Sequence, residues 1–388
     1  MRIVDVCGFY SPFGGGVKTY IERKLVAGPA MGHDITIIAP SDHDGIEERS
    51  KQARVVHIKA RKFQLDPKYF YFDNEMKLHE AITASKPDIL AASSPWRSAS
   101  QTARWSGAHI PRALIMHADP LSAYAYRWFG RILARDTIDR RFEWFWRHLR
   151  RLDAAYDAVI CANEDLGQRL HDGGLAKVVV NPMGVEDGIF SPVFRDEHLR
   201  ARLLARCGLS PHATLLLGAG RLSAEKRWPF VADAVVAAGH KAPIGLIIAG
   251  DGRNKRSIAR YVRDLPHVQL IAPTKTRAQF ARLLASADAL IHGCEAETFG
   301  MVGAEARASG LPVVAPDQGG IADQARGPGS RLYTANDVGS AAAAISDFVA
   351  EGAAQARALA TAQAGSVRTM DQHFADLFAL YAQMRANA

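Results

Sequence analysis

The chain has 388 residues, of which 48% are hydrophobic and 23% are charged, and its formal net charge is +8. This length favours two domains, each with enough apolar residues for its own core. No apolar run reaches the length of a membrane span, and residues 1–6 lack the apolar segment of a signal peptide, so we expect a cytoplasmic protein. Four scattered cysteines without metal-ligand spacing predict buried thiols in a reducing compartment. The positive charge fits an anionic partner or merely aids solubility.

The first part of the chain alternates between strands and helices. Residues 3–6 predict a buried strand, 12–16 a glycine-rich loop, 17–30 a helix and 34–39 a second strand. A strand, helix and strand in this order form a βαβ unit, which implies a parallel sheet. Further buried strands are predicted at 55–58, 89–92, 113–116, 158–161 and 178–180.

A second series of strands follows residue 211. These strands are predicted at 215–218, 245–249, 268–271, 289–292 and 312–315, separated by helical segments. The polar segment 195–211 is predicted to connect the domains, and residues from 339 onward, alanine-rich and free of proline, predict helices. We therefore predict an α/β protein of two Rossmann-like doubly wound domains, 1–192 and 193–367, facing across a cleft. A last helix, at about 368–388, is expected to pack back on the first domain.

The segment 292–314, HGCEAETFGMVGAEARASGLPVV, has the strongest chemical signature. A strand ends near His292, a loop carries Glu297, and a helix beginning near Gly300 holds Glu305 in its second turn. The first amides of that helix form an anion site suited to a pyrophosphate. Carboxylates beside such a site repel phosphate, so Glu297 and Glu305 are better suited to accept hydrogen bonds from ribose or hexose hydroxyls.

The spacing of Glu297 and Glu305, with Phe299-Gly300 between them, resembles the Glu-seven-Glu motif. This motif marks the retaining GT-B glycosyltransferase family that includes sucrose synthases and bacterial phosphatidylinositol mannosyltransferases. Further ordered matches are the glycine-rich loop 14–20, Met183-Gly184-Val185-Glu186, Gly220-Arg221-Leu222, Glu225-Lys226, Ala249-Gly250-Asp251-Gly252 and Gly319-Gly320. The resemblance implies the GT-B fold and retaining transfer of a hexose, such as mannose or glucose, from a UDP- or GDP-linked donor, with no cofactor.

The resemblance also assigns roles to individual residues. Arg221 and Lys226 hold the donor diphosphate, Glu305 binds the ribose and Glu297 binds the transferred hexose. A histidine at the end of strand 113–116 faces the transferred sugar in the family, which assigns this role to His117. The predicted catalytic residues are His117, Arg221, Lys226 and Glu297. The predicted donor-binding residues are Gly15, Gly16, Arg221, Lys226, Phe299, Gly300, Met301, Val302 and Glu305.

Several nearby patterns have competing interpretations. Asp119 could cap the next turn or touch substrate, and the glycines at 14–16 could approach a ligand or form a plain turn. The glycines at 14–16 do not complete the fingerprint of a dinucleotide site, because Thr19 or Val17 stands where a further glycine is needed. Gly218-Ala219-Gly220 fails as well, because Ser223 stands at its third glycine position, so an oxidoreductase is disfavoured. Asp42-His43-Asp44 spells the Asp-x-Asp of metal-dependent glycosyltransferases, but it lies in a loop far from the motifs, and we predict no metal site.

Residues 124–153 predict a basic and aromatic helix. Its core face is Ile138, Phe142, Phe145, Leu149 and Leu152, at helical spacing. The opposite face carries Arg140, Trp144, Arg147 and Arg151. A tryptophan among arginines suits an anionic membrane interface, or packs on a solvated surface.

We therefore predict an enzyme, peripheral on the inner face of the membrane, that glycosylates a lipid or a lipid-linked glycan. The alternative within the class is a soluble acceptor or an exopolysaccharide precursor. A more distant alternative is a basic nucleic-acid-binding protein, against which the chain lacks any recognised nucleic-acid module.

Overall fold

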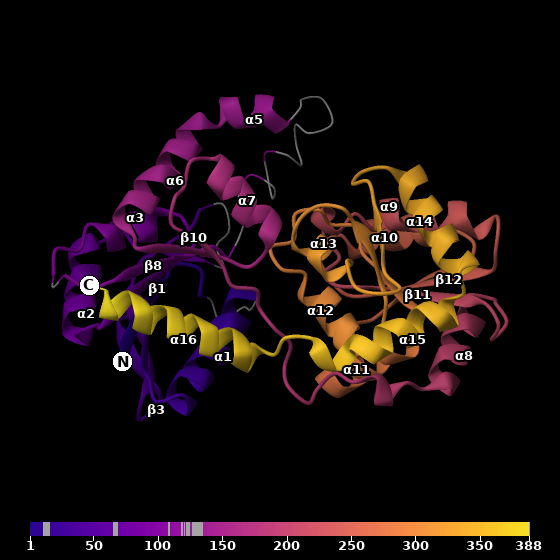
Figure 1. Cartoon of the computed structure of the whole chain (residues 1–388), viewed down its shortest axis with the longest axis horizontal. Helices are drawn as coiled ribbons and strands as arrows, with labels where there is room; N and C mark the ends of the chain where they lie inside the picture. The colour runs from indigo at the N-terminus through magenta and orange to yellow at the C-terminus, as the bar shows by residue number, and fades with distance from the viewer. Residues whose placement is uncertain are drawn as a thin grey trace. The chain divides into compact units, whose positions relative to one another are not determined.

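The computed structural model describes residues 1–10, 16–64, 69–107, 109–117, 119, 121, 125 and 135–387. Two compact units make up the chain, the first formed by Met1–Pro182 with Met370–Ala388 and the second by Met183–Thr369. Each unit is an open parallel sheet with covering helices, as Figure 1 shows. The predicted α/β class with two Rossmann-like domains is confirmed.

The sheet of the first unit has eight strands in the order β10-β9-β8-β7-β1-β2-β4-β3. Neighbouring strands are parallel, except that β3 pairs antiparallel with β4 at the edge. The strands are β1 (Arg2–Cys7), β2 (Asp34–Ser41), β3 (Gly45–Ser50), β4 (Ala53–Lys59), β7 (Ile89–Ser93), β8 (Arg112–Ile115), β9 (Ala158–Cys161) and β10 (Val178–Val180). Central strands such as β1 and β7 are almost entirely buried, as parallel strands covered on both faces must be.

Helices flank this sheet, with α1 and α16 on one side and α3, α6 and α7 on the other (Figure 1). The helices are α1 (Gly16–Ala30), α2 (Glu75–Ser85), α3 (Arg97–Ala103), α5 (Arg135–Arg141), α6 (Glu143–Ala155), α7 (Glu164–Asp172) and α16 (Met370–Ala386), and β5 (Arg61–Lys62) pairs with β6 (Phe70–Tyr71). The last helix packs on α1, where the Tyr20 hydroxyl lies 3.1 Å from His373 Nε2. Aromatic contacts of Phe374 with Tyr20 complete this part of the core.

The second unit has a six-stranded parallel sheet in the order β13-β12-β11-β14-β15-β16. Its strands are β11 (Thr214–Ala219), β12 (Ile244–Ala249), β13 (Val268–Ile271), β14 (Ala289–Ile291), β15 (Val313–Pro316) and β16 (Arg331–Tyr333). Its helices are α8 (Glu197–Arg206), α9 (Trp228–Gly239), α10 (Lys255–Val262), α11 (Arg277–Ser286), α12 (Met301–Ala308), α13 (Gly320–Gln324), α14 (Val338–Ala350) and α15 (Ala353–Gln363), with short 3-10 turns η2 (Pro192–Phe194), η3 (Ala224–Lys226) and η4 (Ala364–Ser366).

The prediction that residues 195–211 connect the domains was wrong. This segment contains α8, which Asp196 caps by accepting from the Leu199 amide at 2.9 Å. Arg200 of this helix also donates to the Asp288 carboxylate at 2.6 Å, which holds α8 within the second unit. A polar composition suggested a linker, whereas these polar residues are used in capping and pairing.

The chain instead passes between the units after Pro182 and again after Thr369. The ends of these two segments pair within the second unit, where the Val185 amide donates to the Arg368 carbonyl at 2.9 Å. A Cβ on Gly184 would lie 2.1 Å from the Thr369 carbonyl carbon, which explains the glycine in the segment 183–186.

Candidate functional site

The loop between β14 and α12 positions the predicted phosphate-binding amides. Gly300 precedes the helix with φ of 78°, a left-handed conformation that favours glycine. The first backbone hydrogen bond of α12 runs from the Gly303 amide to the Gly300 carbonyl, at 2.8 Å. The amides of Met301 and Val302 therefore precede the helical ladder, at the positive end of the helix dipole.

Two glycines hold this loop in place. Gly319 has φ of 72°, and a Cβ there would lie 2.4 Å from the Glu295 carbonyl oxygen. The next residue, Gly320, donates its amide to the Glu297 carbonyl at 2.7 Å, and a Cβ on it would lie 2.6 Å from Phe299 Cα. The glycine pair thus forms a turn on which the Glu297 loop packs without room for side chains.

Lys226 and Glu297 are in direct contact. Lys226 ends η3, and its Nζ donates to Glu297 Oε1 in an ion pair with side chains 13% and 20% exposed. Burial lowers the pKa of Lys226 below its ordinary value. The cation expected to bind a diphosphate is therefore already joined to the carboxylate expected to bind a hexose.

His292 lies beside this pair, although the sequence analysis gave it no role. Its Nδ1 accepts from the Cys294 amide at 3.1 Å, and its Nε2 lies 3.4 Å from Glu297 Oε1. Burial, with the nearby positive charge of Lys226, lowers the pKa of His292 well below 6.5, so the ring is neutral. A second ion pair, Arg227 with Glu295, extends the same polar cluster.

Glu305 has a different partner. It is 5% exposed, and burial raises the pKa of its carboxyl, while Arg277 Nη2 donates to its Oε1 at 2.7 Å. Arg277 also donates to Glu186 Oε2 at 2.7 Å, and its guanidinium lies 4.8 Å from the centre of the Phe190 ring. Sequence reasoning missed Arg277, because an arginine just after the capping Thr276 of α11 carries no distinguishing pattern.

The structure does not bring every predicted donor residue to this cluster. The Arg221 side chain is 77% exposed, and its guanidinium lies 3.7 Å from Glu225 Oε1. Gly16 begins α1 in the first unit and is exposed, and Gly15 lies outside the described residues.

His117 belongs to a buried polar chain in the first unit. Its Nε2 lies 3.1 Å from Ser93 Oγ, which donates to Asp5 Oδ1 at 2.9 Å. Asp5 Oδ2 accepts from Lys24 Nζ at 2.7 Å, and both members of this ion pair are 0% exposed. Burial lowers the pKa of His117 to about 4, with Lys24 adding to the shift and Asp5 opposing it. At neutral pH, His117 is therefore an uncharged ring at the carboxyl end of β8, beside Tyr20 at 4.7 Å between ring centres.

Two other candidate positions have local partners. Asp119 accepts from the Leu121 amide at 3.1 Å and pairs with Arg169, in agreement with its interpretation as a turn cap. Asp44 of the Asp-x-Asp sequence accepts from the Lys59 amide at 2.7 Å and from Lys77 at 3.1 Å. Within the described ranges, no group of three His, Cys, Asp or Glu side chains could hold a metal ion.

Over the described residues from 135 onward, the basic and aromatic segment forms two helices, whereas a single helix was predicted. Phe142 separates α5 from α6, so Arg140 lies on a different helix from Trp144. Trp144 is 58% exposed, and Arg140, Arg147 and Arg151 are also exposed. The core residues of the segment are buried as predicted, except that Phe142 is only half-buried. In the described part of the chain, no helix is both long enough and apolar enough to cross a membrane.

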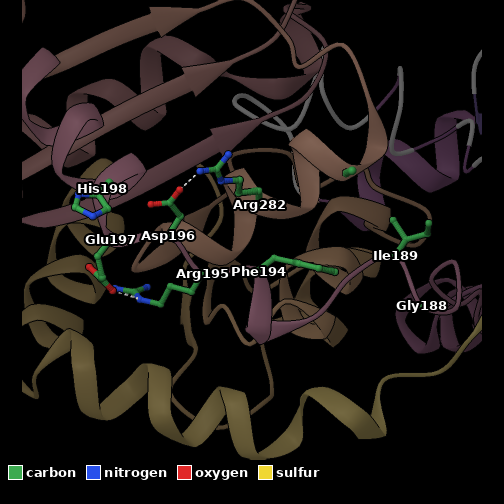
Figure 2. Close-up of a pocket in the computed structure, with 9 residues that line it drawn as sticks. Gly188, Ile189, Phe194, Arg195, Asp196, Glu197, His198 and Arg282 are labelled. Atoms are coloured by element: carbon green, nitrogen blue, oxygen red, sulfur yellow. Dashed lines mark hydrogen bonds and ion pairs between the residues drawn. The ribbon is translucent and has the colours of Figure 1, made fainter.

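A separate hollow of about 740 Å³ lies in the second unit, between the segment 188–198 and α11. Figure 2 shows Arg282 directed at Asp196, and Arg195 directed at Glu197, as ion pairs in its lining. None of the Glu-seven-Glu residues lines it. The hollow is therefore distinct from the cluster around Lys226 and Glu297.

The two Rossmann-like units and the Glu-seven-Glu motif define a GT-B glycosyltransferase. The same architecture occurs in a sucrose-phosphate synthase from Thermosynechococcus elongatus, with a TM-score of 0.74 at 16% identity over 100% of both chains. More particularly, the chain belongs to the glycosyltransferases of group 1 and family 4, which are retaining and use nucleotide-sugar donors. Residues 213–351 match the model "Glycosyl transferases group 1" and residues 14–188 match "Glycosyltransferase Family 4".

Two curated relatives have different acceptors in their names. A GDP-mannose-dependent alpha-(1-6)-phosphatidylinositol dimannoside mannosyltransferase of Mycobacterium tuberculosis is 28% identical over 81% of this chain and 79% of its own length. A glycogen synthase of the same species is 27% identical over 94% of this chain and 90% of its own length. Family membership thus establishes a glycosyltransferase and leaves the acceptor to be assigned.

Proposed function

We propose that this protein transfers a hexose from a UDP- or GDP-linked donor to a membrane lipid or a lipid-linked glycan at the cytoplasmic face of a membrane. The observation that carries the proposal is the contact between Lys226 and Glu297 beside the start of α12. This contact brings together a cation for the diphosphate and a carboxylate for sugar hydroxyls. The relatives that act on phosphatidylinositol mannosides support the lipid acceptor.

In this proposal the donor diphosphate binds Lys226 and the amides of Met301 and Val302. Arg221, whose side chain is exposed, adds a second cation for the diphosphate. Glu305 binds the ribose hydroxyls, and Phe299 and Gly300 shape the loop around the diphosphate. Gly15 and Gly16 also contribute to donor binding, and His117 contacts the transferred sugar.

The reaction breaks the bond between the anomeric carbon and the diphosphate oxygen and forms a bond from that carbon to the acceptor oxygen. The acceptor proton passes to the departing phosphate on the same face of the sugar, which retains the anomeric configuration. Lys226, Arg221 and the helix amides stabilise the negative charge that develops on the diphosphate. We propose that these groups suffice without a metal ion.

The exposed residues around α6 support a lipid acceptor. Trp144 presents an amphipathic ring, and Arg147 and Arg151 lie on the same helix, with Arg140 on the neighbouring α5. Cations near an anionic bilayer each contribute about 1 kcal/mol to binding. The second candidate is a soluble acceptor, which the similarity to a glycogen synthase favours.

The test offers the purified protein labelled UDP- and GDP-hexoses together with a bacterial lipid extract. We expect label from one donor to enter the organic phase, and the Glu305→Ala variant to lose this transfer. If one donor is slowly hydrolysed while no label enters the organic phase, the lipid acceptor is wrong and the soluble acceptor takes its place. If no donor is transferred or hydrolysed, the proposed donor chemistry is wrong.

A further inference from the structure

His292 is a buried polar side chain of the second unit that has no role in the proposed reaction. It is 1% exposed, and within the part of the chain that the structure describes its Nε2 has no hydrogen-bond partner. A buried donor without an acceptor destabilises a folded protein, so such a group calls for an explanation.

The tautomer of His292 is fixed by its surroundings. Because Nδ1 accepts from the Cys294 amide at 3.1 Å, the single proton of the neutral ring is on Nε2. The backbone is fixed as well: the His292 amide donates to the Val314 carbonyl at 2.9 Å, and the Tyr333 hydroxyl donates to the His292 carbonyl at 2.5 Å. The ring therefore presents a rigid N–H donor.

That donor lies 3.4 Å from Glu297 Oε1, farther than the usual distance of about 2.7–3.2 Å in an N–H···O hydrogen bond. The same oxygen accepts from Lys226 Nζ in the present structure. Two donors therefore converge on one carboxylate oxygen, and only Lys226 is bonded to it. In the proposed reaction, a diphosphate competes with Glu297 for Lys226, which would leave Oε1 without its present donor.

We propose that His292 is a positioning residue. When Lys226 leaves Glu297 to bind the donor diphosphate, the His292 Nε2–H donates a hydrogen bond to Glu297 Oε1 in place of Lys226. Glu297 then keeps the orientation in which its other oxygen binds the hexose. This inference rests on the proposed function, because it needs Lys226 and Glu297 to bind a nucleotide-sugar. It adds a residue that acts through Glu297 and itself touches neither sugar nor phosphate.

Two substitutions separate this role from packing. Asn at position 292 can still accept from the Cys294 amide, but has no donor at the place of Nε2. Gln places an amide N–H close to that position. We expect His292→Asn to lower kcat by ten- to a hundredfold with a smaller change in the donor KM, since a small misplacement of a sugar-binding group has effects of this order. His292→Gln should recover most of the activity.

Equal activity of His292→Asn and wild type would overturn the inference, as would a Gln variant no better than Asn. The wild-type protein provides a second measurement, should either variant fail to fold. With ¹⁵N-labelled histidine, the Nε2 resonance of His292 should be that of a protonated nitrogen and should shift when UDP or GDP is added. An unprotonated Nε2 at neutral pH would also overturn it. If wild type itself transfers and hydrolyses no donor, the proposed function fails, and the inference with it.

Discussion

Each unit contains an ion pair between a lysine and a carboxylate near the carboxyl ends of its central strands, and the two pairs differ in their surroundings. Lys24 and Asp5 in the first unit are both 0% exposed, and Ser93 bonds the second oxygen of Asp5. Lys226 and Glu297 in the second unit are 13% and 20% exposed. The first carboxylate has a partner on each oxygen, whereas two donors converge on a single oxygen of the second.

The difference indicates how the same chemical pair serves stability in one place and function in another. A fully enclosed charge pair cannot exchange partners, because separating it would leave two buried charges without compensation. A partly exposed pair with a spare donor beside it can open when a ligand supplies new partners. We therefore assign the Lys24–Asp5 pair to the fold and the Lys226–Glu297 pair to donor binding.

The largest expected effect comes from breaking the enclosed pair. Lys24→Met leaves the Asp5 carboxylate buried without its cation and should lower the free energy of unfolding by about 3–5 kcal/mol. Chemical denaturation measures this change. Lys255→Met is the control, because Lys255 pairs with Asp251 on an exposed surface. Loss of this exposed pair should not change the free energy of unfolding measurably. Similar stability of the two variants would contradict the assignment of Lys24–Asp5 to the fold.

Removing the second lysine should affect activity more than stability. Lys226→Ala deletes a cation that faces the developing charge of the diphosphate and should lower kcat/KM by about a hundred- to a thousandfold. Steady-state transfer from the active donor measures the change. Lys241→Ala, on an exposed position of the same unit, should leave kcat/KM unchanged. Full activity of Lys226→Ala would contradict the assignment of Lys226 to the donor site.

A smaller effect tests the network around the enclosed pair through its dependence on pH. Burial holds the pKa of His117 in the folded protein at about 4, below the ordinary histidine value of 6.5. The unfolded chain therefore binds more protons between these values, and stability is lost as pH falls from 6.5 toward 4. His117 contributes about 3 kcal/mol at most to this loss in the free energy of unfolding. Denaturation of His117→Gln across this range should show a flatter slope than wild type, and parallel slopes would contradict the buried neutral ring.

Much of the fold could be read from the sequence, because apolar runs separated by helical segments specify parallel strands. The glutamates of the 292–314 motif also lie as expected, since a strand end and a glycine-started helix fix them locally. The edge strand β3 was missed because most of its residues are polar and exposed. The partners of the motif were missed for another reason: Arg277 reaches Glu305 from a helix 28 positions earlier, and this contact leaves no local pattern.

The most direct test of the account is the affinity for UDP and GDP by calorimetry, in wild type, Lys226→Ala and Glu297→Gln. We predict that wild type binds one of these nucleotides and that Lys226→Ala binds it at least about tenfold more weakly, because a charged contact to phosphate is lost. Glu297→Gln should bind it at least as tightly as wild type, because its lysine is released from the ion pair. Equal affinity of Lys226→Ala and wild type would contradict the claim that this ion pair opens to receive the donor.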